Sequence, residues 1–170
     1  MESFQVRASW ADKPFFYRAP YPESNLTPYE YQLAGAEYCL ARDNALIGDE
    51  PGLGKTCQGI LISNAIEAKR TLVVCPASLR LNWEREIWKW STIENVQTYP
   101  VLKSKDGIHL KTNYLIISYD LLRNRGLLKA LLSQTWDHLI LDEAHKLKDP
   151  KGNQTTSVIC KPDALPSVVG

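Results

Sequence analysis

The chain has 170 residues, of which 44% are hydrophobic and 23% are charged, and its formal net charge at pH 7 is +1. This composition is typical of one soluble domain that is large enough to bury a core. The near-neutral charge excludes a generally basic protein, so any nucleic-acid surface must be a local patch. No run of 18 or more apolar residues appears, and the four cysteines lack C-x-x-C spacing, which favours a reduced, intracellular protein without a membrane span.

The first regular element is expected only after a lead-in. Residues 1–26 are rich in proline and aromatic side chains, which predicts an extended segment. Thr27 then offers an N-cap, Pro28 suits the first helical position, and Glu30 stands three positions after the cap. This capping-box pattern predicts a helix that continues to about Arg42.

A short apolar run, a glycine-rich turn and a helical pattern follow in that order. Ala45–Gly48 predicts a strand, and Thr56 opens a segment whose apolar residues recur at helical spacing to about Ala68. Between them lies Asp49-Glu50-Pro51-Gly52-Leu53-Gly54-Lys55-Thr56. A strand, a glycine-rich turn and a helix in this order are the setting of a phosphate-binding loop.

The rest of the chain alternates between strand and helix patterns. Strands are predicted at Thr71–Cys75, Val96–Tyr99, Tyr114–Ser118 and His138–Leu141, and helices at Leu79–Trp90 and, with a break near Gly126, at Asp120–Gln134. Most of these strands lack polar alternation, which is typical of a parallel sheet that is covered on both faces. The alternation of strands and helices therefore predicts a layered α/β fold with a mainly parallel central sheet and right-handed crossovers.

The glycine-rich turn has the chemistry of a triphosphate site. Backbone N–H groups at Gly52 and Gly54 can surround phosphate oxygens, Lys55 can reach the β and γ phosphates, and the Thr56 hydroxyl can bind magnesium. Asp49 stands where the usual loop begins with glycine. The competing interpretation is a tight turn followed by a solvated lysine.

An acidic segment, Asp142-Glu143-Ala144-His145, follows the last predicted strand. Asp142 can hold magnesium through its water shell, and Glu143 can orient and deprotonate the attacking water. The alternative is an exposed acidic start of a helix, with His145 as a surface histidine.

Together these motifs resemble superfamily 2 helicases and, more narrowly, DNA translocases of the Swi/Snf type. The resemblance is carried by the glycine-lysine-threonine loop, the Asp-Glu-Ala-His box, Gln32 within Tyr-Glu-Tyr-Gln, and Pro-Ala-Ser-Leu leading to Asn-Trp-Glu-Arg-Glu. It covers about residues 26–150 and implies a three-layer RecA-like P-loop lobe that binds ATP and Mg²⁺. A small P-loop kinase fits less well, because the acidic box and Gln32 argue against it.

The resemblance implies a role for each matching residue. Gln32 would read the adenine edge, and His145 would couple the nucleotide state to the DNA-binding parts. The catalytic set is Lys55, Asp142, Glu143 and His145, magnesium falls to Thr56 and Asp142, and the nucleotide set is Gln32, Asp49, Glu50, Pro51, Gly52, Leu53, Gly54, Lys55, Thr56 and Cys57. An aromatic residue among Phe15, Phe16 and Tyr17 would cover the adenine ring or else anchor the lead-in to the core.

Candidate nucleic-acid residues form a second group. By resemblance, Ser78, Arg80, Ser118 and Tyr119 lie on the nucleic-acid face, and Arg123 with Arg125 and Lys129 could extend a phosphate-tracking patch. A solvated helix face explains the same basic residues equally well. Trp83, Trp88 and Trp90 could stack on bases, although the core is the more common place for such residues.

The end of the chain departs from the family. The expected order is a lead-in at residues 1–26, the lobe at 27–156 and a tail at 157–170 that is the truncated end of a longer protein. A Ser/Thr-Gly-Thr segment and a second RecA-like lobe with arginine fingers are missing, so we expect the sheet to lack an interior strand.

The function expected from the resemblance is the ATP-binding lobe of a DNA-dependent ATPase, with duplex DNA favoured as its partner. The alternative is a non-catalytic scaffold that binds a nucleotide or a partner protein. The protein would work in the cytoplasm if it is prokaryotic or viral, and in the nucleus if it is eukaryotic.

Overall fold

A computed structural model describes residues 21–22, 26–42, 44–50, 52–109 and 111–144. Its elements in chain order are α1 (Glu30–Leu40), α2 (Lys55–Ala65), β1 (Thr71–Cys75), η2 (Ala77–Leu79), α3 (Arg80–Trp90), β2 (Thr98–Pro100), η3 (Ser104–Asp106), β3 (Tyr114–Ser118), η4 (Leu121–Arg123), α4 (Arg125–Leu132) and β4 (His138–Leu141). None of the described helices is long and apolar enough to cross a membrane. The predicted tail and most of the lead-in lie outside these residues.

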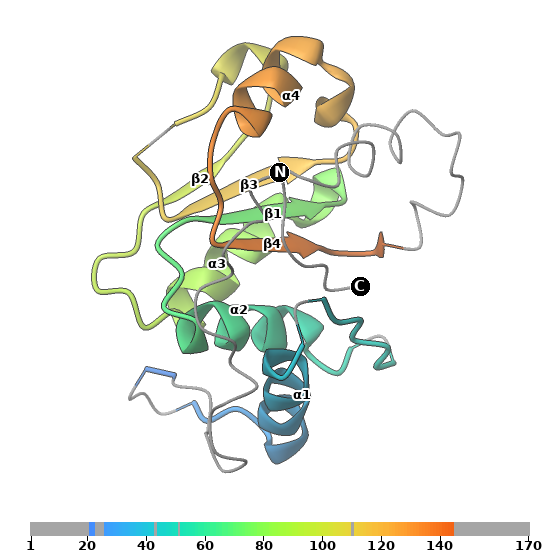
Figure 1. The fold of residues 1–170 in the computed structure, drawn as a ribbon, viewed down its shortest axis with the longest axis vertical. Helices are drawn as coiled ribbons and strands as arrows, with labels where there is room; N and C mark the ends of the chain where they lie inside the picture. Colours follow the sequence, from blue (N-terminus) through green and yellow to red (C-terminus); the bar gives the residue numbers. More distant parts are fainter. Residues whose placement is uncertain (1–20, 23–25, 43, 51, 110, 145–170) are drawn as a thin grey trace, which may run out of the picture.

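The strands form one sheet in the order β2-β3-β1-β4, and every described pair is parallel. Helices α1, α2 and α3 lie below the sheet in Figure 1, and α4 lies above it. The predicted α/β fold with a mainly parallel sheet is therefore confirmed. Because β1, β3 and β4 run in parallel, their carboxyl ends at Cys75, Ser118 and Leu141 meet at one edge, which is where such sheets bind ligands.

Alternate residues of each buried strand enter two separate cores. One core joins one face of the sheet to α1, α2 and α3, and it includes Val73, Ile116 and Ile140. The other joins the opposite face to η4 and α4 through residues such as Val74 and Ile117. Burial on both faces explains why these strands are apolar throughout.

The predicted strand at Ala45–Gly48 is wrong. No residue from 44 to 50 is in a strand, and β4 pairs with β1 alone within the described part of the chain. Ile47 is still buried in the first core, whereas Leu46 is 70% exposed. A strand needs a hydrogen-bonded neighbour, and no described strand lies beside this run.

Two helix boundaries also differ from prediction. Helix α1 begins at Glu30 and not at Pro28, because Tyr29 and not Thr27 is its N-cap. The side chain of Gln32, and not that of Glu30, accepts the N–H of the capping residue, at 3.0 Å. The break before α4 lies at Asn124, whose Oδ1 accepts the N–H groups of Gly126 and Leu127 at 3.0 and 3.1 Å.

Candidate functional site

The glycine-rich turn is folded as a loop that leads directly into α2. Gly52 has φ +90° and Gly54 has φ +76°, so both adopt the left-handed conformation that favours glycine. A Cβ added at Gly54 would also overlap the amide nitrogen of Gln32. Pro51 and its side chain lie outside the described residues. The two glycines therefore allow a backbone conformation in which most other residues would be strained.

Lys55 closes this loop on itself. Its Nζ donates to the carbonyl oxygens of Asp49 at 2.7 Å and Glu50 at 3.2 Å. The ammonium group is therefore held within the curve of the loop, at the amino end of α2. An anion bound there would meet the lysine charge and the positive end of the helix dipole together.

Gln32 links α1 to the same loop. The side chain is 6% exposed, and its Nε2 donates to the Leu53 carbonyl at 3.1 Å. Its other amide atom accepts the Tyr29 N–H, so both ends of the amide have partners. The structure thus brings Gln32 to the loop, while its contact with adenine stays a prediction.

Gln58 is a site residue that the sequence motifs did not indicate. It is fully buried in α2, and its Nε2 donates to Asp49 Oδ2 at 2.6 Å. The pair ties the first residue of the loop to the helix that follows it. Asp49, which replaces the usual glycine, is the only local signal that such a partner was needed.

Cys57 does not offer its side chain to a nucleotide. The thiol is 3% exposed and belongs to the first core, and burial raises its pKa to about 12. A buried protonated thiol contributes packing. Only the backbone of Cys57 can take part in the predicted nucleotide contacts.

Asp142 directly follows β4 and is fixed at three atoms. Its N–H donates to the Val74 carbonyl at 2.8 Å, its carbonyl accepts from the Tyr119 hydroxyl at 2.8 Å, and its Oδ2 accepts from Trp83 Nε1 at 2.8 Å. Burial raises the pKa of this carboxyl group, and the Trp83 hydrogen bond opposes that rise. Glu143 is exposed and has φ +56°. His145 lies outside the described residues.

The loop and the acidic segment lie close enough to interact electrostatically. After the larger effects of burial, the Trp83 bond and Glu143, the charge of Lys55 also lowers the pKa of Asp142. Thr56 lies in the first turn of α2, directly after that lysine. A hydroxyl and a carboxylate are hard oxygen donors of the kind that Mg²⁺ prefers. In the described part of the chain, no group of three or more His, Cys, Asp or Glu side chains is arranged to hold a metal ion.

The predicted nucleic-acid residues separate into buried and exposed ones. Ser118 and Tyr119 are only 2% and 3% exposed, so their side chains belong to the fold and not to a surface. Arg80 donates to the carbonyls of Ala77, Val101 and Leu102, which ties α3 to the segment after β2. Ser78 and Arg123 are exposed, and their role stays a prediction.

The tryptophans divide in the same way. Trp83 and Trp90 are 2% and 6% exposed, and both belong to the first core. Trp88 is 59% exposed. Base stacking by Trp83 or Trp90 is therefore excluded in this conformation, in agreement with their alternative interpretation as core residues.

Comparison with known proteins places these features in one family. Residues 31–161 match the SNF2-related domain. The chain is 36% identical to the bovine (Bos taurus) DNA excision repair protein ERCC-6-like over 159 residues, which cover 82% of this chain and 12% of that protein. It is 32% identical to human (Homo sapiens) DNA repair and recombination protein RAD54B over 162 residues, which cover 82% of this chain and 18% of that one.

A solved structure has a similar fold. The Sulfolobus solfataricus SWI2/SNF2 ATPase core in complex with dsDNA superposes with a TM-score of 0.69 at 23% identity. The match covers 86% of this chain and 33% of that one. The chain thus spans about a third of that ATPase core and less than a fifth of the two repair proteins.

Proposed function

The chain belongs to the SNF2-related family, and from this premise we propose that it is the ATP-binding part of a DNA-dependent ATPase that moves along or remodels DNA. The observation that supports the proposal is the meeting of three separate segments. Gln32 of α1 contacts the loop, and Lys55 lies within it. Asp142 is close enough to that lysine for the lysine charge to lower the pKa of its carboxyl group. In the proposed complex, these three residues would be the partners of the nucleotide base, its phosphates and a magnesium ion.

In this proposal, ATP replaces the hydrogen bonds that Lys55 makes to the carbonyl groups of Asp49 and Glu50. The phosphates take the Lys55 ammonium and the N–H groups near Gly52 and Gly54, while Gln32 faces the adenine. Thr56 and Asp142 would hold Mg²⁺, which would supply positive charge to neutralise the phosphates during the reaction.

Hydrolysis then needs little covalent chemistry from the protein. Glu143 orients a water molecule whose oxygen attacks the γ phosphorus, and it accepts the proton of that water. The bond to the β–γ bridging oxygen breaks, and ADP leaves with the electron pair. His145 would couple this event to the DNA-binding parts.

Duplex DNA is the proposed partner of the whole protein. The protein would act in the compartment that contains the DNA of the cell. Ser78 and Arg123 are exposed residues available for phosphate contacts. A second RecA-like lobe supplying an arginine finger is also proposed, since such a residue adds roughly 10³- to 10⁵-fold to the rate of related reactions.

Two substitutions in the complete protein test the proposed nucleotide site. Lys55→Ala should abolish ATP binding or hydrolysis, and Lys111→Ala, an exposed lysine on the loop before β3, should not. Glu143→Gln should keep nucleotide binding and lose hydrolysis, while Glu94→Gln, an exposed glutamate between α3 and β2, serves as its matched control. The measurements are nucleotide affinity and phosphate release with and without duplex DNA.

Unchanged turnover in the Lys55 variant would refute the site. ATP binding without any DNA-stimulated phosphate release would instead favour a scaffold that uses nucleotide only for its structure.

A further inference from the structure

The side chain of Trp83 connects α3 to the acidic segment. The indole is 2% exposed, and its Nε1 donates to Asp142 Oδ2 at 2.8 Å across 59 positions of sequence. A buried tryptophan N–H generally finds some acceptor. Here the acceptor is the carboxylate of Asp142, which the proposed function assigns to magnesium, so this hydrogen bond connects Trp83 to the proposed metal site.

The indole ring lies close to Gly59 of α2. A Cβ added at Gly59 of α2 would lie 3.5 Å from Trp83 Cη2 and 3.4 Å from Ile140 Cδ1. The absence of a side chain at Gly59 therefore lets α2, Trp83 and β4 meet at one point. Trp83 and Ile140 belong to the same core, and Ile140 lies in β4 two residues before Asp142.

The backbone of Asp142 is already fixed without Trp83. Its N–H and its carbonyl are bound to Val74 and Tyr119. These two backbone bonds do not fix the χ1 and χ2 angles of the Asp142 side chain. The Trp83 N–H restricts these two angles, because it donates to a carboxylate oxygen of Asp142.

We propose that Trp83 is a positioning residue that holds the Asp142 carboxylate in the orientation needed to bind magnesium beside the phosphates. The proposal rests on the proposed nucleotide function and adds to it a residue outside the loop and the acidic box. Hydrogen-bond partners of metal-binding groups commonly change metal affinity 10- to 100-fold when they are removed. A purely structural tryptophan would affect folding and leave the magnesium dependence alone.

Helix α3 supplies a matched control. Trp90 is also buried, at 6% exposure, and its Nε1 donates to Glu86 Oε2 at 2.8 Å. Trp83 and Trp90 lie on the same helix, and Trp83→Phe and Trp90→Phe each remove one indole N–H that donates to a carboxylate while keeping an aromatic ring. They differ in whether that carboxylate is Asp142.

The first experiment measures the affinity of each protein for fluorescent ATP, once with Mg²⁺ and once with EDTA. In wild type and Trp90→Phe, Mg²⁺ should strengthen binding by the same factor. In Trp83→Phe that factor should fall about tenfold, with the affinity in EDTA unchanged. An unchanged factor, or an equal loss with and without Mg²⁺, overturns the positioning role. A wild-type protein that binds no ATP would refute the proposed function, which is a different failure.

The second experiment needs no variant, which covers the case in which Trp83→Phe does not fold. In wild-type protein labelled with ¹⁵N at tryptophan, the Trp83 indole N–H signal should move when Mg²⁺ is added to the nucleotide complex, and the Trp90 signal should not. A Trp83 signal that ignores Mg²⁺ while nucleotide binding responds to it overturns the inference.

Discussion

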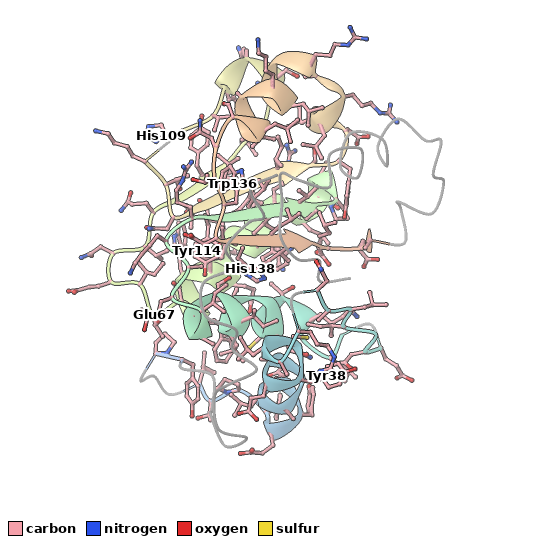
Figure 2. All side chains as sticks on the ribbon, viewed as in Figure 1. Tyr38, Glu67, His109, Tyr114, Trp136 and His138 are labelled. Carbon is pink, nitrogen blue, oxygen red and sulfur yellow. The ribbon has the colours of Figure 1, made fainter. Side chains whose placement is uncertain are left out.

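The buried histidine at the start of β4 makes stability depend on pH. His138 is 2% exposed, and its Nδ1 lies 2.7 Å from the Ser63 hydroxyl of α2. Figure 2 shows His138 and Tyr114 between the sheet and the helices below it. Burial lowers the pKa of His138 from 6.5 to about 4. The folded protein therefore holds this imidazole neutral at pH values where the unfolded chain protonates it.

The sign and the size of the effect follow from these two pKa values. Above pH 6.5 the group is neutral in both states, and its contribution to stability is fully present. As the pH falls from 6.5 toward 4, the unfolded state binds a proton that the folded state does not. The free energy of unfolding should drop by about 2 kcal/mol at pH 5 and by about 3 kcal/mol at pH 4.

Urea unfolding at pH 7.5 and pH 5.0 tests this reasoning. His138→Gln keeps a neutral polar side chain and should lose about 2 kcal/mol less than wild type between the two pH values. His109→Gln is the control, because His109 is exposed and lies on the outer side of the molecule (Figure 2). Equal losses in wild type and His138→Gln would refute the assignment of this pH dependence to His138.

The remaining predictions concern the loop. Gly54→Ala should lower the free energy of unfolding, measured in urea, by about 1–3 kcal/mol and weaken ATP binding, because φ is +76° and the new Cβ would overlap Gln32. Gly48→Ala is the control and should change neither quantity, because a Cβ added there would have no heavy atom within 4 Å. Gln58→Leu should weaken ATP binding and lower stability by about 1–3 kcal/mol, because it removes the donor to Asp49. Combining Gln58→Glu with Asp49→Asn exchanges donor and acceptor and should restore binding lost in either single variant; no recovery would argue against the pair.

Local patterns predicted what depends on local chemistry. The strands Thr71–Cys75, Tyr114–Ser118 and His138–Leu141 have the predicted bounds, because burial on both faces leaves a continuous apolar run in the sequence. Ala45–Gly48 has a similar run without a described strand beside it, and a single sequence does not reveal which neighbours a strand will find.

The same limit applies to the candidate site. The loop and the acidic segment are short motifs, so their residues could be named before the fold was known. The partners of those residues come from elsewhere: Gln58 acts on a residue nine positions earlier, and Trp83 on one 59 positions later. Side-chain pairs between elements leave no periodic signal, and the apolar setting of Trp83 indicated only a core residue.

The hydrogen bonds of Lys55 determine what a measured nucleotide affinity at this site means. Because the Lys55 ammonium already has the carbonyls of Asp49 and Glu50 as acceptors, an incoming nucleotide exchanges partners and does not simply add them. The measured affinity is then the difference between two sets of hydrogen bonds, one of which leaves two carbonyl groups to find water. Substituting this lysine therefore changes the free protein as well as the complex, because it removes the hydrogen bonds to the carbonyl groups of Asp49 and Glu50.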